Sequence, residues 1–280
     1  MKLLRVGKQG IERPATLDNH GQLRDLSSLI EDIQPSSLSP ESIAQLQQAD
    51  LNALPIIDSA ERIGACIAHV GKLVCIGLNY SDHAEEAGMD IPNEPIVFMK
   101  ATSAICGPND DIEIPKGSTK TDWEVELAVV IGSRAKYITE DEVEDHIAGY
   151  CVGNDLSERE FQLERLGSWD KGKSHDTFAP LGPYLVTKDD IPDPQHLTLW
   201  TKINDQAVQQ GNTATMVFTV KQIIAYLSQF MTLEPGDVVL TGTPPGVGMG
   251  CKPPHYLKNG DLVEVGISGL GHQQQVCRQA

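Results

Sequence analysis

The chain has 280 residues, of which 40% are hydrophobic and 22% charged, as is usual for a globular protein with a sizeable core. Its formal net charge of -17 at pH 7 argues against a broad nucleic-acid or anionic-membrane surface, although a bound cation could still attract a small anionic substrate. No stretch approaches the ~20 apolar residues of a membrane span, and the first ten residues lack the apolar segment of a secretory signal, so we expect a cytoplasmic protein.

The first seventy residues are predicted to form a small N-terminal α/β domain. Two short strands and a turn are expected at residues 2–7, 13–18 and 19–21. A polar helix is expected over residues 39–54, because Ser39 suits its N-cap and Pro40 its first turn. We therefore divide the chain into domains at 1–70 and 71–280.

The larger second part is predicted to be rich in strands and to contain few helices. Strands bounded by Gly, Pro, Asn or Asp are expected at residues 70–77, 94–107, 122–132, 147–155, 181–187, 197–204, 237–243 and 260–268. Helices are expected at residues 81–88, 139–146, 157–167 and 219–230. In the first of these, Ser81 is the expected N-cap and Gly88 the expected end. The spacing does not fit a regular βαβ repeat, so the predicted class is β-rich α+β.

The segment TDWEVELAVV at residues 121–130 places two carboxylates on one face of a predicted strand. Side chains alternate along a strand, so Glu124 and Glu126 point the same way. Burying both would cost several kcal/mol per charge unless a cation compensates them; the alternative is a solvated face. Asp155 ends another apolar strand and could complete an all-oxygen site for Mg²⁺ or Mn²⁺, or it could be an ordinary helix N-cap.

Other polar groups occur near the ends of predicted elements. His83 and Glu86 share a helix face, where the carboxylate could fix the imidazole as a base; a surface pair is the alternative. Lys171 and Lys173 lie in a loop rich in Gly and Pro, where a lysine is solvated unless it binds a carboxylate or stabilises an enolate. The Gly-rich loop at residues 238–250 lacks the lysine of a P-loop and could instead bind a carboxylate.

Seven phrases of the sequence together resemble the fumarylacetoacetate hydrolase family. In chain order they are IGLNYSDHAEEAG, PIVFMK, DWEVELAVVIG, GYCVGNDLSERE, GKSHDTFAPLGP, LEPGDVVLTGTPPGVG and NGDLVEVGISGLG. They span residues 76–271. The resemblance implies a mixed β-sandwich roll, usually a homodimer. The N-terminal region looks like that of the bacterial branch named for ureidoglycolate lyase or for the hydrolase of diketo-deoxy sugar acids.

The resemblance also implies a metal centre and a base. Glu124, Glu126 and Asp155 match the residues that hold Mg²⁺, or Mn²⁺, in the family. His83 matches the base that activates water, and Glu86 matches the carboxylate that orients it.

Further residues match the family's catalytic and substrate-binding positions. Lys173, in the K-S-x-D-x-F phrase, matches the active-site lysine better than Lys171 does. Arg159 and Gln162 match substrate-binding positions, and Thr243 matches the threonine that meets the substrate carboxylate. We find no departure from the family pattern at the ligand positions.

The implied activity is metal-dependent hydrolysis of a carbon–carbon bond in a 2,4-dioxo acid, which gives a pyruvate-type product and a carboxylic acid. The implied partner is a small anionic 2-oxo acid, and a polar sugar-derived chain is favoured by resemblance alone. The same site could decarboxylate oxaloacetate, tautomerise a keto acid or cleave ureidoglycolate. A non-catalytic metal-binding protein is the explanation from another class. Whether residues 81–92 form a mobile lid is left open.

Overall fold

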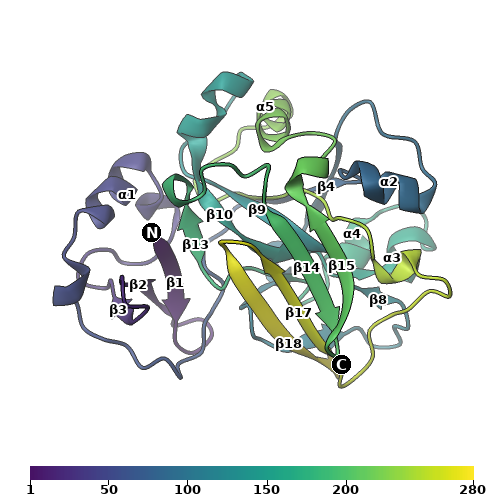
Figure 1. Cartoon of the computed structure of the whole chain (residues 1–280), viewed down its shortest axis with the longest axis horizontal. Helices are drawn as coiled ribbons and strands as arrows, with labels where there is room; N and C mark the ends of the chain where they lie inside the picture. Colours follow the sequence, from purple (N-terminus) through teal and green to yellow (C-terminus); the bar gives the residue numbers. More distant parts are fainter.

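Two β-sheets packed against each other form the body of the molecule, and the computed structural model describes all 280 residues (Figure 1). The larger sheet consists of β1 (Lys2–Val6), β2 (Arg13–Leu17), β3 (Leu23–Asp25), β4 (Leu73–Gly77), β5 (Ile96–Lys100), β9 (Val125–Ile131), β10 (Ile147–Asn154), β13 (Leu185–Thr187) and β16 (Val238–Leu240). Its strand order is β3-β2-β1-β13-β10-β9-β16-β4-β5. The β4–β16 pair is parallel, whereas β9 runs antiparallel to both of its neighbours. The predicted strand-rich class with a mixed sheet is therefore confirmed.

The smaller sheet covers the middle of the larger one. It consists of β7 (Ile112–Ile114), β14 (Thr198–Ile203), β15 (Gln206–Asn212), β17 (Leu262–Ile267) and β18 (Gly271–Gln279). Its order is β15-β14-β17-β18-β7, and β14 and β17 contact β9. Short pairs are formed by β6 (Ile105–Cys106) with β12 (Ala179–Pro180), and by β8 (Thr121–Asp122) with β11 (Ser157–Glu158).

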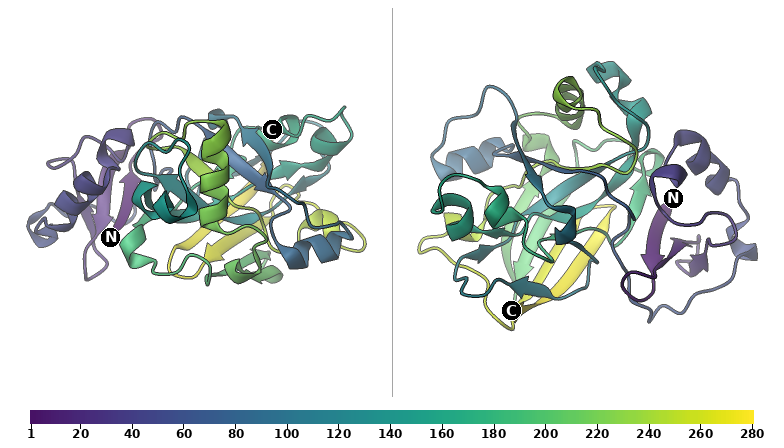
Figure 2. Two further views of the ribbon diagram at one scale, coloured as in Figure 1. Left: turned by 90° about the horizontal axis from the view of Figure 1, so that it is seen from above. Right: turned by 180° about the vertical axis from the view of Figure 1, so that it is seen from behind.

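The helices are short and lie around the sheets. They are α1 (Pro40–Gln47), α2 (Ser81–Ala87), α3 (Arg159–Leu163), α4 (Asp170–Lys173) and α5 (Val220–Phe230). A 3₁₀ helix of seven residues lies at Glu140–His146, and single 3₁₀ turns occur at Pro35–Ser37, Leu51–Ala53, Thr102–Ala104, Lys188–Asp190, Thr213–Thr215 and Gly248–Gly250. Figure 2 shows α1 at the end of the long axis that holds β1 to β3, and α2, α3 and α4 at the opposite end. None of these helices combines the length and apolar character needed to cross a membrane.

The two central strands, β9 and β10, are buried at every position. Their sequences, VELAVVI and IAGYCVGN, lack the polar alternation of a strand with one wet face, which is typical of strands covered on both sides. Antiparallel pairing aligns Gly153 with Glu126 and Asn154 with Val125. The start of β9 and the end of β10 therefore lie side by side, and the acidic residues gather at this end of the two central strands.

Several strands are missing from the sequence prediction, most clearly β15 and β18. The sequence of β18, GHQQQVCRQ, has glutamine at inward positions, so no apolar alternation marks it as a strand. Gln273 is fully buried, and its side-chain amide donates to Val152 O at 2.9 Å. Gln209 of β15 is likewise buried and donates to Thr243 Oγ1 at 2.9 Å. These partners, Val152 O on β10 and the Thr243 hydroxyl in the loop after β16, are distant in sequence, and no local pattern could reveal them.

The beginning of α2 differs from the prediction, whereas its end does not. Tyr80 occupies the N-cap, and the hydroxyl of Ser81 donates to Thr215 O at 3.2 Å instead of capping the helix. Gly88 ends the helix in the left-handed conformation, with φ 63°, as predicted. The prediction of Ser81 as N-cap was wrong because a tertiary contact takes its hydroxyl.

Two predicted helices are shorter in the structure. The helix expected over residues 39–54 ends at Gln47, although Ser39 does cap it, accepting from the N–H of Ser42. The helix expected over 157–167 is reduced to α3, because Ser157 and Glu158 pair with β8 instead. The other two predicted helices form, at Glu140–His146 as a 3₁₀ helix and at Val220–Phe230 as α5, each with a capping box.

The N-terminal region joins the rest of the molecule through backbone and charge contacts. β1 pairs with β13, so residues 1–70 contribute three strands to the larger sheet. The Arg62 guanidinium also bonds Asp110 at 2.6 Å. A small separate apolar cluster lies within this region, made of Leu4, Val6, Ala15, Leu23 and Ile57. The domain boundary at residue 70 stays a prediction.

Candidate functional site

A cavity of about 680 Å³ opens at the end of the molecule where α2, α3 and α4 lie. Its lining includes eight of the nine residues that the sequence selected: His83, Glu86, Glu124, Glu126, Arg159, Gln162, Lys173 and Thr243. The ninth, Asp155, is fully buried beside them. The structure thus brings all nine together from segments far apart in the chain, although their roles stay predictions.

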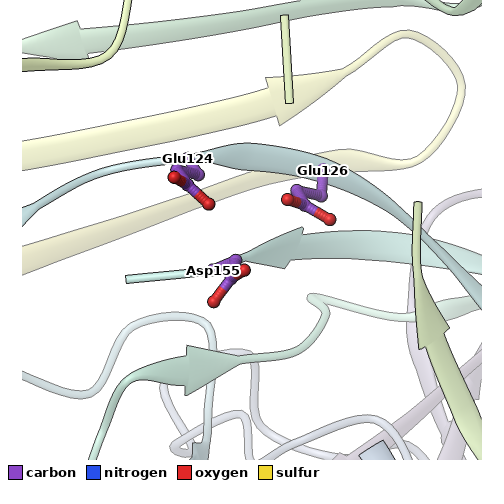
Figure 3. A group of neighbouring side chains, drawn as sticks. All are labelled: Glu124, Glu126 and Asp155. Carbon is purple, nitrogen blue, oxygen red and sulfur yellow. The ribbon is translucent and has the colours of Figure 1, made fainter. Parts of the chain in front are cut away.

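The three acidic side chains converge on one point (Figure 3). Glu124, Glu126 and Asp155 each offer a carboxylate oxygen, and these oxygens lie within 4.8 Å of one another. Glu124 precedes β9 and is held there by two hydrogen bonds: its N–H donates to Asn154 Oδ1 at 3.0 Å, and its C=O accepts from Asp155 N at 2.9 Å. All three residues are buried, which excludes a solvated strand face. Asp155 is not a helix N-cap either, because Glu158 caps α3.

Two buried lysines neutralise part of this charge. Lys173 Nζ donates to Glu124 Oε2 at 2.7 Å and to Asp155 Oδ2 at 2.8 Å. Lys100, at the end of β5, donates to Asp155 Oδ1 at 2.5 Å and to Leu156 O at 3.0 Å. Lys171 is exposed and bonds the carbonyl of Arg165, so the structure separates the two lysines of the DKGK segment as the resemblance implied.

Sequence reasoning missed Lys100. Its side chain is fully buried, and it fixes the Asp155 oxygen that Lys173 does not contact. The available signal was a lysine at the end of the apolar strand of PIVFMK, since a charge that enters a core from such a strand needs a partner.

Replacing Lys100 by Met is expected to lower the free energy of unfolding by about 3 kcal/mol. Asp155 would lose one of its two cationic partners while staying buried, and an uncompensated buried charge is strongly destabilising. Urea unfolding followed by circular dichroism measures the loss. Lys116→Met is the matched control: Lys116 is exposed and unpaired, so its replacement should change stability by less than about 0.5 kcal/mol. Equal stability of the two variants would refute the role of Lys100.

The charges set opposite ionisation preferences in the two glutamates. Burial by itself would raise the pKa of Glu124, but Lys173 and Arg159 outweigh it and lower that pKa to about 2. Glu126 pairs with no cationic side chain and accepts one hydrogen bond, from Gly242 N at 2.7 Å. Burial and the charges of Asp155 and Glu124 therefore raise the pKa of Glu126 well above its usual value. Burial lowers the pKa of Lys173, but Asp155 and Glu124 reverse the effect and raise it.

These shifts predict that the metal-free protein loses stability as pH rises above about 5. The raised pKa of Glu126 means that the folded state binds a proton which the unfolded chain releases near pH 4.3. This contribution is complete below about pH 4.3 and is lost as pH rises toward the folded pKa. Glu124 acts oppositely, but its contribution is lost only below about pH 4.

The measurement is urea unfolding in chelator at several pH values from 5 to 8. Glu126→Gln is the control, because a glutamine cannot ionise and should flatten the slope. The same slope in wild type and in this variant would contradict the assignment to Glu126.

Arg159 and Gln162 project from α3 into the cavity and are already bonded to each other. Arg159 donates from Nη1 to Gln162 Oε1 at 3.1 Å and from Nε to Asp122 Oδ2 at 2.8 Å. Its Nη2 lies 2.7 Å from Glu124 Oε1. Asp122 is fully buried and also accepts from Gly248 N at 2.6 Å, so it joins Arg159 to the loop after β16. Sequence reasoning missed Asp122 because its partners are distant in the chain.

His83 and Glu86 form the expected pair on α2. His83 Nδ1 lies 3.2 Å from Glu86 Oε2. A carboxylate accepts at this site, so Nδ1 carries the hydrogen and Nε2 keeps a lone pair for a proton. Both carboxylate oxygens of Glu86 also accept from Gly246 N at 3.1 Å, which ties α2 to the loop after β16.

Thr243 lies in the site, but its hydroxyl has protein partners. It donates to Val125 O at 2.9 Å and accepts from Gln209 Nε2 at 2.9 Å. A substrate carboxylate could receive this hydrogen only if the bond to Val125 broke. The predicted contact of Thr243 with substrate therefore requires a rearrangement.

Known proteins are similar to this chain in both sequence and fold. Residues 72–277 match the family model described as fumarylacetoacetate (FAA) hydrolase C-terminal. A relative from Burkholderia cenocepacia, named "Putative hydrolase", is 59% identical over 281 residues and covers 100% of both chains. The solved fumarylacetoacetate hydrolase from Exiguobacterium antarcticum has a TM-score of 0.87 at 34% identity and covers 100% of both chains. Maleylpyruvate hydrolase from Sphingobium has a TM-score of 0.83 at 26% identity, again covering 100% of both chains.

Proposed function

Because this chain belongs to the fumarylacetoacetate hydrolase family, we propose that it is a divalent-metal-dependent hydrolase of 2,4-dioxo acids. It would cleave the bond between C3 and C4, giving a pyruvate-type product and a carboxylic acid. The observation that carries this proposal is a buried cluster of three carboxylates beside a His–Glu pair in one cavity. Maleylpyruvate, the substrate in the name of one structural neighbour, is itself an acylpyruvate.

The acidic cluster fits a divalent cation. Its donors are all oxygen, which suits Mg²⁺ or Mn²⁺ better than zinc or copper. Lys173 and Arg159 lower the pKa of Glu124 and keep it ionised, while Glu126 has no cationic partner among the side chains. Glu124, Glu126 and Asp155 would hold the ion, which when bound would supply a Lewis acid for the 2-oxo group of the substrate.

The chain's own residues would supply the rest of the chemistry. His83 Nε2 would take a proton from water, with the Nδ1 hydrogen donated to Glu86, and the resulting hydroxide would attack C4. As the C3–C4 bond breaks, its electron pair becomes an enolate, and Lys173 Nζ would stabilise the oxygen charge. The protonated His83 would then return its proton to C3. Arg159 and Gln162 would bind the substrate carboxylate.

Product identity tests the proposal. The purified chain is assayed with Mg²⁺, with Mn²⁺ and with chelator on acetylpyruvate, oxaloacetate and ureidoglycolate. We expect pyruvate and acetate in equal amounts from acetylpyruvate, and no turnover in chelator. Pyruvate plus carbon dioxide would identify a decarboxylase, and glyoxylate plus urea a lyase. No turnover of any compound would favour a non-catalytic protein.

The same proposal extends to assembly. A homodimer is expected from the family resemblance, and light scattering of the purified chain measures its mass directly.

A further inference from the structure

The cavity has two chemically different parts. Its polar side chains are mostly the candidate catalytic and metal-binding groups, whereas 11 of its 23 lining residues are hydrophobic. We call six of these the apolar wall: Met89, Ile96, Phe98, Leu163, Trp169 and Met249. They come from the segment after α2, from β5, from α3, from the start of α4 and from the 3₁₀ turn at Gly248–Gly250. Different elements thus supply apolar side chains to one cavity.

The apolar wall is contiguous with the catalytic end of the cavity. The Phe98 ring centroid lies 5.0 Å from Lys173 Nζ, which bonds Glu124 and Asp155. The same ring packs edge-on against Trp169, with the two centroids 5.3 Å apart. A substrate whose 2-oxo acid end lies near Lys173 would therefore place its next atoms against these two rings.

The position of Trp169 is fixed by the backbone beside it. Its ring lies so close to Gly77, at the end of β4, that a Cβ there would come within 2.9 Å of the ring. Only a residue without a side chain leaves this space. The indole of Trp169 is therefore packed against Gly77 and Phe98, so the apolar wall does not depend on a freely rotating side chain.

The outer part of the apolar wall is exposed to solvent. Met89 is 57% exposed, Leu163 48% and Met249 39%. Neighbouring apolar side chains at a cavity mouth are typical of a ligand-binding surface, because covering them removes apolar area from water. The only hydrogen-bonding groups among these six side chains are the indole N–H of Trp169, a single donor, and the weak thioether sulfurs of the two methionines.

We propose that the substrate carries an apolar chain or an aromatic ring beyond C4, which lies on the apolar wall. This inference rests on the proposed function and narrows its substrate class. It replaces the polar, sugar-derived chain that the resemblance favoured, because the wall offers a polyhydroxylated chain one donor, the Trp169 indole N–H, and no strong acceptor in place of the water that it would lose. The exposed Lys252 is the one lysine or arginine of the lining to which the proposed function gives no role, and it could bind a carboxylate at the far end of a substrate instead.

A series of acylpyruvates with identical 2,4-dioxo ends tests the inference. The probes are 2,4-dioxopentanoate, 2,4-dioxoheptanoate, 2,4-dioxononanoate and 4-phenyl-2,4-dioxobutanoate. The matched polar probes are 5,6-dihydroxy-2,4-dioxohexanoate and 2,4-dioxoheptanedioate. We expect kcat/KM to rise about threefold for each added methylene. The dihydroxy and dicarboxylate probes should fall at least about tenfold below the apolar probe of similar length. A preference for either polar probe would overturn the inference.

Paired leucine variants localise the effect. Leu163→Gln should lower the ratio of kcat/KM for 2,4-dioxononanoate over 2,4-dioxopentanoate about fivefold. Leu166→Gln is the control, since Leu166 is three residues further along, 99% exposed and outside the lining. An equal ratio in both variants would refute the assignment of the wall.

Cleavage of 2,4-dioxopentanoate distinguishes failure of the proposed function from failure of the inference about the apolar wall. If that probe is cleaved, the length series judges the wall alone. If no probe is cleaved, calorimetry of 2-oxononanoate against pyruvate decides: tighter binding of the longer acid supports the wall, and equal or absent binding overturns it.

Discussion

Glu126→Gln should lower kcat with saturating Mg²⁺ at least about 1000-fold and weaken Mg²⁺ binding at least about 100-fold. The glutamine keeps the volume of the side chain and an oxygen to accept from Gly242 N, so the fold should persist. It removes the negative charge of the glutamate that has no cationic partner in the protein. Steady-state kinetics measures kcat, and calorimetry measures the dissociation constant for Mg²⁺.

The matched control for this variant is Glu264→Gln. Glu264 lies on β17, is partly exposed and is outside the cavity lining. The Glu264→Gln variant should bind Mg²⁺ and turn over substrate like the wild type. Unchanged metal affinity in Glu126→Gln would disprove the ligand assignment even if turnover fell.

Replacing His83 by Ala should lower kcat about 1000-fold, within the usual range for loss of a general base, and leave the dissociation constant for Mg²⁺ unchanged. The imidazole bonds Glu86 and does not contact the acidic cluster directly, so the metal ligands keep their positions. Calorimetry and kinetics together separate loss of the base from loss of the metal. Full hydrolysis of an acylpyruvate by the variant would remove His83 from the mechanism.

The chain offers a close control for the histidine. His196 and Asp193 form another pair three residues apart, with 2.7 Å between Nδ1 and Oδ2, but it lies outside the lining and His196 is 71% exposed. His196→Ala should leave kcat unchanged. A similar loss in both histidine variants would indicate a general effect on folding.

The parts of the site that could be predicted from sequence depend on local periodicity. Glu124 and Glu126 are two apart near the start of an apolar strand, and Asp155 directly follows another, so alternation and strand ends made them candidates. The family resemblance was needed to prefer a metal site over a solvated face and a helix N-cap. His83 and Glu86 likewise share a helical spacing that local reasoning can recognise.

The parts that could not be predicted depend on partners distant in sequence. Lys100 meets Asp155 across 55 positions, and Asp122 meets Gly248 across 126. The buried glutamines of β18 have the same cause, since Gln273 bonds Val152 O in the other sheet. A lysine at the end of an apolar strand, as in PIVFMK, indicates that a partner is needed, but no local pattern indicates which distant residue supplies it.

The two roles of Glu86 have a mechanistic consequence. One carboxylate sets the tautomer of His83 and also accepts from the backbone of the loop after β16. A swing of α2 away from that loop would break these loop bonds and change the surroundings of the acceptor that fixes the base. Because His83 and Glu86 both lie on α2, their mutual bond would persist, but the base would move away from the acidic cluster as the entrance opened. His83 would then activate water only while α2 closes the entrance of the cavity.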